Sequence, residues 1–428
     1  MYWSTNEMFH TSIFSKVMAR DRFLLILKFI HFNDNEDPNY DTDSEDRDRL
    51  HKIRPLIDLL RERCQKVYQP GCDLSVDESL VLFKGRLHFK QFIRTKRARF
   101  GVKLYELTTS DGITLDFLVY CGKGMFADDD PHYDMPSTER IPVILLQNFL
   151  GKGHVLYTDN FYTSPSLALF LLQNKTHLCG TIRTNRRKFS KEIVNVNLEK
   201  GTSAFYVTLN QKAMLACKYR SHKDKAGNQP KVVHMLSTCH QPSSIDTNRT
   251  QMNGDAIIKP EAVWNYNLHM GGVDRVDQQL HSFDILRKSY KWYKKIAFRL
   301  ISQCLLNSSK VYDFHAGAEA QLTFHQFVHS VISSLIIEET AEPELLDPVN
   351  ENVPRVNENI SRLNGRHFMS QLPKPSIKKC RVCYAQKKRT ANGHAIKTSF
   401  ICKTCPSKPG LHPDTCFELF HTKQNFTE

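Results

Sequence analysis

The sequence predicts an α/β protein of several domains, and three observations lead to this. From residue 74 the spacing of apolar residues changes from a helical to an alternating pattern, and strand-like and helix-like segments then follow one another to residue 183. Five of the twelve cysteines lie in the last fifty residues, which indicates a small separate module. With 428 residues, 40% of them hydrophobic, the chain can bury a large core and is expected to form roughly two to four domains.

The charge balance favours a polyanionic partner. The formal net charge is +14 and the isoelectric point is about 9.1. Each phosphate that Lys or Arg neutralises releases counterions, although charge alone does not distinguish DNA from RNA. No apolar run approaches the ~18 residues that span a bilayer, and the first residues lack the charged start and apolar stretch of a secretion signal. We therefore expect a soluble, unsecreted protein that does not bind a membrane.

The first part of the chain, residues 1–72, is expected to be helical. Apolar residues recur at helical spacings over residues 9–30 and again over residues 50–67. Between these two segments, residues 34–48 carry eight acidic side chains together with Pro and Asn. We interpret this acidic stretch as a solvated loop.

Residues 73–183 have the pattern of a mixed sheet with helices. Their alternating runs predict three strands, then a helix, a strand, a helix and a strand. A Ser-Asp-Gly turn at 110–112 suits a hairpin, and Ser164 followed by Pro165 is a helix-start signal. The expected segments are 74–83, 102–108, 113–121, 141–150, 154–159, a helix from 165, and 178–183. This order of elements resembles a ribonuclease-H-like core.

The remaining chain divides into four further segments. Short alternating runs separated by Gly, Asn and Pro predict a β-rich insertion over residues 184–260. Helical periodicity returns over residues 261–283, which would complete the core, and continues over residues 284–337. Seven acidic residues and three prolines between 338 and 358 indicate an exposed linker, residues 338–379, before a cysteine-rich module at 380–421.

Four aspartates form a candidate metal site: Asp77, Asp159, Asp274 and Asp277. The first would lie on the first strand of the sheet and the second at the end of the fourth, while the last two, three residues apart, would share a helix face. Hard divalent cations held by carboxylates can cut or join phosphodiesters. A single Asp after a strand is more often a cap or turn residue, so the hypothesis depends on the whole set.

The neighbours of these aspartates receive other interpretations. Gly271 and Gly272, just before the helix, would let the backbone approach closely or would open the helix. Glu78 would point to the opposite sheet face from Asp77, so we do not assign it to the metal. The run of three aspartates at 128–130 is interpreted as a solvated loop.

A basic stretch follows the first aspartate directly. Eight Lys or Arg residues lie within residues 84–103, four phenylalanines lie within residues 83–100, and no acid occurs between 79 and 105. This combination suits a DNA groove or unstacked bases, and a plain basic surface is the alternative. The residues assigned to DNA binding here are Lys84, Arg86, Lys90, Arg94, Lys96, Arg97 and Arg99.

A second basic patch follows the helix of Asp274. At helical spacing Lys288, Lys291, Lys295 and Arg299 would line one stripe, while apolar residues of the same helix pack inward. The aromatic residue Trp292 could wedge into a base step, and the alternative is that it belongs to the core. The residues assigned to DNA binding here are Arg287, Lys288, Lys291, Trp292 and Lys295.

The last cysteines and histidines are typical of structural zinc. Two CxxC pairs place paired thiolates on tight turns that suit tetrahedral Zn²⁺. The candidate ligands are Cys380, Cys383, Cys402, Cys405, His412, Cys416 and His421. Seven ligands exceed one site and fall one short of two, so His394 or another group is expected to supply the eighth. The surrounding basic residues would permit DNA docking, with protein binding as the alternative.

Several ordered blocks of the sequence resemble the piggyBac family of DNA transposases and the proteins derived from them. The resemblance covers nearly the whole chain, and it lies in MYWSTNEMFHTSIFSKVMARDRFLLILKFIHF, SVDESLVLFKGR, YTDNFYTS, MGGVDRVDQ and the cysteine module ending CFELFHTK. It implies a ribonuclease-H-like core with a β insertion before the last catalytic helix. It also implies that residues 1–72 and 284–337 serve in DNA binding and dimerisation.

The chemistry that the resemblance implies is cut-and-paste transposition of double-stranded DNA. Mg²⁺ or Mn²⁺ bound by Asp77, Asp159 and Asp274, with Asp277 as the additional carboxylate, would support nicking at transposon ends, hairpin formation and joining to TTAA targets. It implies a nuclear homodimer whose zinc module recognises the transposon end. The match begins inside the family's helical region, so we expect an incomplete amino-terminal part. A DNA-binding protein without catalysis and a structure-selective nuclease are the rival hypotheses.

Overall fold

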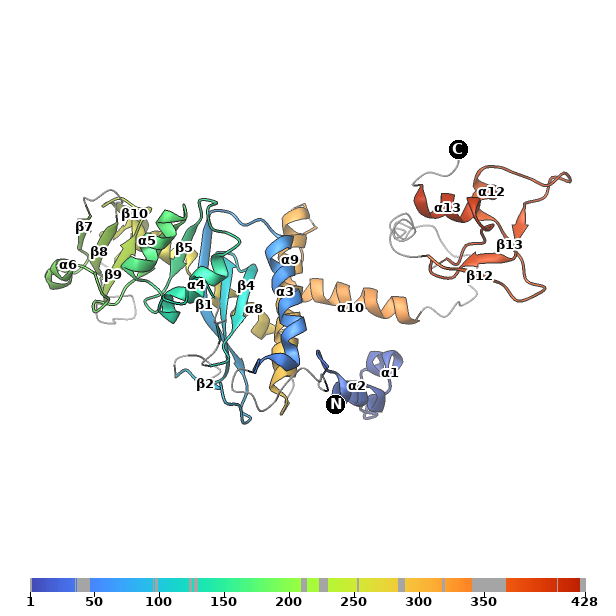
Figure 1. Ribbon diagram of the computed structural model, residues 1–428, viewed down its shortest axis with the longest axis horizontal. Coiled ribbons are helices and arrows are strands. Elements are labelled where there is room, and N and C mark those ends of the chain that lie inside the picture. The colour runs from blue at the N-terminus through green and yellow to red at the C-terminus, as the bar shows by residue number, and fades with distance from the viewer. Residues whose placement is uncertain are drawn as a thin grey trace. The chain divides into compact units, whose positions relative to one another are not determined.

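A computed structural model describes most of the chain, and the described residues form two compact units. The described ranges are 2–34, 36, 47–94, 96, 99–122, 125–126, 130–208, 214–222, 230–251, 254–283, 289–317, 320–340, 367–405 and 407–423. The first unit is Met1–Ala341 and the second is Glu342–Glu428. Figure 1 shows the sheet and its helices in the first unit and the small cysteine-rich fold in the second.

The first unit is built around one nine-stranded sheet in the order β2-β3-β1-β5-β6-β9-β8-β7, with β4 paired to β3. The strands are β1 (Asp73–Leu82), β2 (Gln91–Phe92), β3 (Phe100–Thr109), β4 (Thr114–Val119), β5 (Val155–Thr158), β6 (His177–Thr181), β7 (Ser203–Val207), β8 (Leu215–Arg220) and β9 (Val232–Ser237). β1, β3 and β4 are antiparallel, whereas β5 runs parallel to both β1 and β6. The predicted strand and helix order and the ribonuclease-H-like core are therefore confirmed.

Within the predicted β-rich insertion, the three strands between residues 203 and 237 extend the core sheet. β9 pairs antiparallel with β6, and β8 and β7 follow it outward. A separate two-stranded sheet, β10 (Ser244–Thr250) with β11 (Ala256–Pro260), completes this β-rich region. Periodicity predicted the strands, but which strand they pair with depends on contacts that are distant in sequence.

Helices cover both faces of the sheet. On one face, α4 (Ser137–Leu146), α5 (Pro165–Gln173) and α6 (Lys191–Asn195) pack over an apolar cluster that includes Leu74, Val76 and Leu107. On the other face, α3 (Arg54–Val67) and α9 (Trp292–His315) cover a second cluster with Val81 and Leu104. Figure 1 shows α3 and α9, far apart in sequence, lying side by side over the sheet. Both faces are therefore buried, as in α/β proteins.

Two further helices of the second face lie beside β1. α7 (Glu261–His269) packs its Ala262 and Val263 against β5, β6 and the added strands. α8 (Gly272–Ser282) follows it almost directly and contacts both β1 and β3. The helical periodicity predicted from residue 262 is confirmed for both helices. Residues 284–288, which precede α9, lie outside the described part.

The first two helices are α1 (Ser12–Val17) and α2 (Arg20–Phe29), where one helical segment over residues 9–30 was expected. Met18 and Ala19 have extended backbone between them. The indole nitrogen of Trp3 donates to the carbonyl of Met18 at 2.7 Å, and its ring packs against Phe14 and Phe23. The helix is interrupted because Trp3 satisfies the carbonyl at the break and occupies the space between the two halves.

The described residues of the second unit, 367–405 and 407–423, form a small fold of short strands and helices. It contains β12 (Met369–Gln371), β13 (Lys378–Lys379), α12 (Arg381–Ala385), β14 (Lys397–Thr398), β15 (Phe400–Cys402) and α13 (Thr415–Thr422). β12 pairs with β15 and β13 with β14. Both β12 and β13 lie within the range 338–379 that we expected to be linker, while residues 341–366 lie outside the described part. The folded module therefore begins before Cys380.

The helix α10 (Phe324–Thr340) ends the described part of the first unit and packs on α9. Among the described residues no helix combines the length and apolar character that crossing a bilayer requires.

Candidate active site and zinc-binding module

Strand pairing brings Asp77 and Asp159 side by side. β1 and β5 are parallel neighbours with Val76 opposite Thr158, so the next residue of each strand is an aspartate. Side chains alternate between sheet faces, and Tyr157, two residues before Asp159, packs with α7. Both carboxylates therefore belong to the sheet face that α7 and α8 cover.

The turn after β5 holds Asp159 in a defined conformation. Its Oδ1 accepts from the Phe161 amide at 2.9 Å, and its carbonyl accepts from Thr163 Oγ1 at 2.8 Å. Thr163 Oγ1 also lies 2.7 Å from Thr158 Oγ1. On the neighbouring strand, a Cβ at Gly180 would lie 2.3 Å from Thr163 Oγ1. The absence of a side chain at Gly180 is what leaves room for this turn.

A close backbone approach places α8 against the sheet. A Cβ at Gly272 would lie 2.2 Å from Thr108 Oγ1 and 2.4 Å from the Thr109 carbonyl. A Cβ at Gly271 would meet nothing nearer than 3.9 Å. Gly272 is therefore the residue that permits the approach we expected of the glycine pair, and it brings Asp274 and Asp277 of the same helix next to β1 and β3.

Burial and neighbouring charge raise the pKa values of the two sheet aspartates. Burial raises the pKa of Asp77 to about 7, against the Lys96 ammonium, which lowers it, and with Glu78 and Asp159, which raise it further. Burial and the charge of Glu78 likewise raise the pKa of Asp159. For both carboxyls, the loss of solvation on burial outweighs the effect of the neighbouring cations.

Cationic side chains of the chain itself are paired with the two helix aspartates. Lys96 Nζ lies 3.5 Å from Asp274 Oδ1, and Arg299 Nη2 donates to Asp277 Oδ1 at 2.6 Å. Within the described residues, neither Asp77 nor Asp159 has an ion-pair partner within 4.0 Å. The four carboxylates are also not among the described groups whose ligand atoms lie within 4.8 Å of one another. The aspartates are gathered in one region without forming a closed cage.

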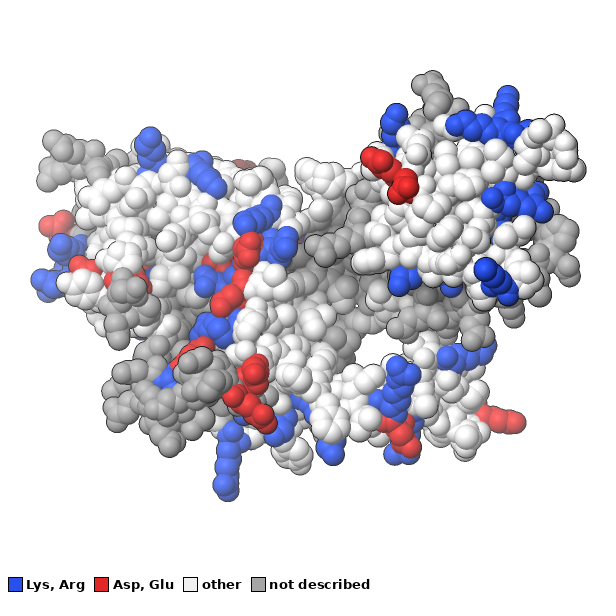
Figure 2. Space-filling view, turned by 45° about the vertical axis from the view of Figure 1, so that its right-hand side comes forward, with Lys and Arg blue, Asp and Glu red and all other residues white. Residues whose placement is uncertain are grey.

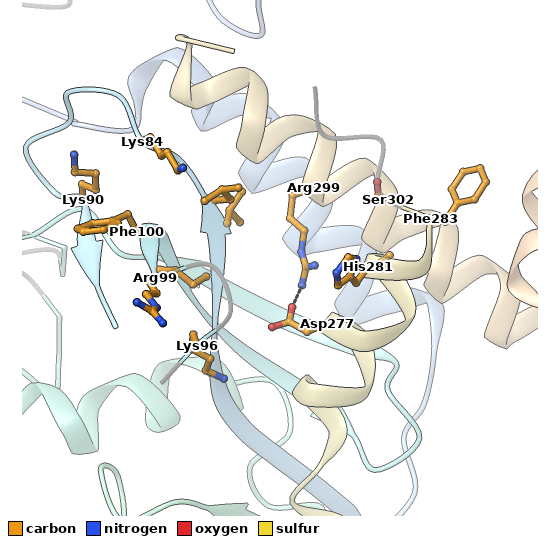
Figure 3. A pocket seen from close by; sticks show the side chains of 14 residues that line it. Lys84, Lys90, Lys96, Arg99, Phe100, Asp277, His281, Phe283, Arg299 and Ser302 are labelled. Carbon is orange, nitrogen blue, oxygen red and sulfur yellow. Dashed lines mark hydrogen bonds and ion pairs between the residues drawn. The ribbon is translucent and has the colours of Figure 1, made fainter. Parts of the chain in front are cut away.

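A pocket of about 890 Å³ opens beside α8 and is lined by five cationic side chains. Figure 3 shows Lys84, Lys90, Lys96 and Arg99 from the segment between β1 and β3 on one side and the Arg299–Asp277 pair on the other. The exposed ring of Phe100 lies in the lining and packs at 4.8 Å from the exposed ring of Phe92. Positive charge and flat apolar surface therefore meet at the edge of the aspartate group.

The other residues assigned to DNA binding are distributed as follows. Arg86, Arg94 and Lys291 are exposed, whereas Arg97, Arg287 and Lys288 lie outside the described part. The stripe predicted on α9 is not a solvent-exposed one, because Lys295 and Arg299 are only 8% and 9% exposed. Helical spacing correctly put them on one side, but that side faces the protein.

The aromatic residue Trp292 lies at the start of α9 and packs within the first unit. Its ring contacts Phe89 edge-on at 5.3 Å and joins the second apolar cluster. The structure therefore favours the core alternative over the proposed wedge between bases.

Sequence reasoning missed a buried polar network behind Asp277. Glu106, directly opposite Asp77 in the β1–β3 register, is fully buried and accepts from Ser79 Oγ at 2.5 Å and Gln303 Nε2 at 2.8 Å. Arg299 lies 3.6 Å from it. Burial raises the pKa of Glu106, against the opposing charge of Arg299. The sequence pattern gives no sign that Glu106 contacts α9, which lies nearly two hundred positions later in the chain.

Two arginines beside the Asp159 turn were also missed. Arg183 donates to Asn160 Oδ1 at 3.0 Å, and its charge lowers the pKa of Asp159 against the larger effect of burial. Arg186 donates to the carbonyl of Phe161. The basic run after β6 is visible in the sequence and could have suggested a cationic surface there.

The second unit contains two groups of four potential zinc ligands. One group is Cys380, Cys383, His412 and Cys416, and the other is His367, Cys402, Cys405 and His421. All seven ligands predicted from the sequence belong to one group or the other. The eighth is His367, while His394 is exposed and belongs to neither group.

The spacing of the ligand atoms fits tetrahedral zinc. Bonds of about 2.3 Å to sulfur and 2.0–2.1 Å to nitrogen imply ligand-to-ligand separations of roughly 3.4–3.8 Å. Cys383 Sγ lies 3.7 Å from Cys416 Sγ and 3.6 Å from His412 Nδ1. In the other group, Cys405 Sγ lies 3.4 Å from His367 Nδ1 and 3.3 Å from His421 Nε2. These residues therefore fit the group that their chemistry suggests.

Outer hydrogen bonds orient two of the histidines. Nδ1 of His421 lies 2.7 Å from the Phe417 carbonyl one helical turn earlier, which leaves Nε2 as the ligand atom. Nε2 of His412 lies 3.3 Å from the Lys397 carbonyl, which leaves Nδ1. Along the sequence the ligands of the two sites alternate. Each site therefore joins segments of the chain that are separated by ligands of the other site.

Basic residues predominate in the cysteine-rich unit. Residues 367–423 contain eleven Lys or Arg and two acidic residues. Figure 2 shows Lys and Arg distributed over several parts of the visible face, with fewer Asp and Glu among them. Charge alone therefore does not select one binding surface, and the pocket beside α8 is the more specific feature.

Comparisons with known proteins agree with this architecture. Residues 1–309 match the protein-family model described as Transposase IS4, and residues 362–422 match the DDE_Tnp_1-like zinc finger. The human PiggyBac transposable element-derived protein 3 is 26% identical over 99% of this chain and 66% of its own length. The human PiggyBac transposable element-derived protein 2 is 26% identical over 72% of this chain and 51% of its own length.

A solved structure shares the fold. It is the cryo-EM structure of the piggyBac transposase synaptic complex with hairpin DNA, with a TM-score of 0.64, 23% identity, and coverage of 94% of this chain and 84% of that chain. The fold and the two metal-ligand sets thus define a transposase-type α/β protein with a zinc finger. The chain belongs to the transposase family whose members include the piggyBac-type proteins. It spans about two thirds of the length of the first relative and half that of the second.

Proposed function

We propose that this chain is a metal-dependent DNA transposase that cuts transposon ends and joins them to target DNA. The observation that carries the proposal is the placement of Asp77 and Asp159 on adjacent parallel strands, with α8 beside them and a cationic pocket at their edge. Family membership supports the same activity. Each part of this arrangement then has its own role in the reaction.

The carboxylates are assigned to binding Mg²⁺ or Mn²⁺. Asp77 and Asp159 would bind from the sheet and Asp274 from α8. Asp277, held by Arg299, would orient the helix and supply the additional carboxylate. When bound, such cations activate an attacking hydroxyl and stabilise the leaving oxygen of a phosphodiester. The raised pKa values of Asp77 and Asp159 support a site in which the neighbouring Lys and Arg side chains do not offset the burial of these two carboxyls, as a divalent cation would.

The cationic pocket is assigned to double-stranded DNA. Lys84, Lys90 and Arg99 would contact phosphates, and the exposed rings of Phe92 and Phe100 provide apolar contact surface. The solved piggyBac complex contains hairpin DNA, which supports this choice of partner. By the same resemblance we propose TTAA target sites, a homodimer, a nuclear location, and recognition of the transposon end by the zinc module.

A DNA-binding protein without catalysis is the second candidate. The observation that favours it is that Asp274 and Asp277 already have cationic partners in Lys96 and Arg299. A chain that no longer needs a metal would tolerate such pairing. DNA binding alone cannot separate the two functions, so the test must follow strand cleavage.

Cleavage of selected DNA tests the proposed activity. Duplexes are first selected for binding from a random library, then flanked with TTAA and incubated with the chain and Mn²⁺. We expect nicked products from the natural chain and at least ~100-fold less from Asp159→Asn, because removing a metal ligand removes charge stabilisation in the transition state. Glu192→Gln, an exposed residue of α6, is the matched control and should cut normally.

Equal products from Asp159→Asn and the natural chain would contradict the assignment of the site. If the natural chain and its variants fold and bind DNA but give no products, the result would favour the second candidate function, a DNA-binding protein without catalysis. Cutting without insertion at TTAA in a strand-joining assay would indicate a nuclease of the same fold.

A further inference from the structure

The ammonium group of Lys96 lies among the aspartates. Its Nζ is 3.5 Å from Asp274 Oδ1 and donates at 2.9 Å to the carbonyl of Glu78, the residue after Asp77 on β1. The Lys96 side chain is 23% exposed, whereas that of Asp274 is 73% exposed. The hydrogen bond to β1 therefore holds a positive charge at the position where the strand and α8 meet.

Four acidic side chains act on this one ammonium group. Burial lowers the pKa of Lys96, but the charges of Asp77, Asp274, Asp277 and Glu78 raise it above its usual value. Lys96 in turn lowers the pKa of Asp77. Three of these four acids are carboxylates that the proposed function assigns to the metal.

The second cation of the site is fixed in a different way. Arg299 is buried, bonded to Asp277 and close to the buried carboxylate of Glu106, so its withdrawal would leave Glu106 without a counter-charge. Lys96 has a flexible stem, a compact point charge and a place in the open pocket of Figure 3. Withdrawal of Lys96 from Asp274 exposes no fully buried acid such as Glu106, because the Asp274 side chain is itself 73% exposed.

We propose that the Lys96 ammonium stands in for the divalent cation in the metal-free chain and withdraws from Asp274 when the metal binds. This inference rests on the proposed function, because it requires the aspartates to bind a metal. Metal binding would then replace the positive charge of Lys96 beside Asp274 by that of the divalent cation. The released ammonium group would remain in the cationic pocket, where DNA phosphates are proposed to lie.

Competition between Lys96 and the metal predicts that removing the lysine tightens metal binding. In the full-length, zinc-loaded chain, Mn²⁺ binding is followed by the electron paramagnetic resonance signal of free Mn²⁺. Lys96→Met is expected to bind Mn²⁺ about tenfold more tightly, which corresponds to a free energy of about 1.4 kcal/mol. The matched control is Lys90→Met, which removes the same charge from the same pocket. Among the described residues, Lys90 donates a hydrogen bond to the Gly85 carbonyl and not to an aspartate.

The two lysine variants decide the inference. A tenfold gain for Lys96→Met with less than a twofold change for Lys90→Met supports it. Equal changes in both variants, or weaker binding by Lys96→Met, overturn it. If Asp77→Asn binds Mn²⁺ as well as the natural chain, the proposed metal site itself falls, and this outcome is distinct from a failure of Lys96 alone.

Chemical labelling of the natural chain gives a second readout that needs no variant. Acetic anhydride modifies exposed amines, and mass spectrometry measures each lysine separately. Labelling of Lys96 should rise severalfold when Mn²⁺ is added, while labelling of Lys84 and Lys90 stays constant. Unchanged or reduced labelling of Lys96 at saturating Mn²⁺ overturns the proposal.

Discussion

At Asp77, the negative charge that metal binding needs lowers the folding stability of the metal-free chain. The Asp77 carboxyl is half-buried beside Asp159, and loss of solvation raises its pKa to about 7, whereas an unfolded-chain aspartate has a pKa of about 3.9. The folded chain therefore holds a proton that the unfolded chain releases. This contribution to stability is complete below pH ~4 and is lost as the pH rises to about 7.

Neutralising this residue should stabilise the metal-free protein more at high pH than at low pH. We expect Asp77→Asn to raise the melting temperature of the zinc-loaded, magnesium-free chain by roughly 2–5 °C at pH 8, with a clearly smaller gain at pH 5, where most of the folded chain still holds the proton. Thermal unfolding followed by circular dichroism at both pH values measures this. The same gain at pH 5, or a loss at pH 8, would show that the charge of Asp77 is not the destabilising feature.

At this scale the sequence predicted the acidic residues but not their partners. Asp77, Asp159 and Asp274 could be selected because strand and helix patterns surround them. The pairing of Asp277 with Arg299, and of both with Glu106, could not, because it joins β3 to α9 through tertiary packing. Spacing placed Arg299 on a stripe with Lys295, but it could not tell that the stripe faces inward.

The position of helix α8 against the sheet depends on its first residue, Gly272. Gly272 lies against Thr108 and Thr109, so the helix axis runs close to β1 and β3. The sequence predicted this close approach from a glycine pair before a helix. The break between α1 and α2 was not predicted, because it depends on Trp3 bonding to Met18 rather than on any helix-breaking residue.

A methyl group at this contact should displace the helix. A Cβ at Gly272 would lie within 2.4 Å of backbone at Thr109, which cannot move without disturbing the sheet. We expect Gly272→Ala to reduce the unfolding free energy by roughly 2–4 kcal/mol and to weaken Mn²⁺ binding, because Asp274 moves with the helix.

Gly271→Ala is the control for this substitution. Its added methyl would meet nothing nearer than Arg275 at 3.9 Å, so urea denaturation should give a stability close to that of the natural chain. Equal effects of the two substitutions would mean that glycine flexibility, and not close packing, matters at this helix start.

At the scale of the whole molecule, the cysteine-rich unit is held together by its ligands. Its small apolar cluster consists largely of the cysteines themselves, with Val382, Leu411 and Phe420. Because the two ligand sets alternate along the chain, neither site is formed within one continuous segment. The sequence revealed seven ligands through CxxC spacing. The eighth, His367, has no motif around it and is recruited by the pairing of β12 with β15.

Zinc content should distinguish His367 from His394. The full chain is expected to hold two zinc ions, one for each ligand group. His367→Ala should lower the zinc measured by mass spectrometry after dialysis to one ion or fewer, because the interleaved sites depend on each other. His394→Ala, the control, should keep both. Loss of zinc from His394→Ala, with both ions kept by His367→Ala, would identify His394 as the eighth ligand.

The central claim is that Asp77, Asp159 and Asp274 gather divalent cations at the edge of the cationic pocket. The most direct measurement is anomalous X-ray scattering at the manganese edge from crystals of the zinc-loaded chain grown with Mn²⁺ and DNA. We predict two manganese peaks about 3.5–4 Å apart between β1, β5 and α8. Manganese found only elsewhere in a well-ordered structure, with none bound by the three aspartates, would contradict this assignment.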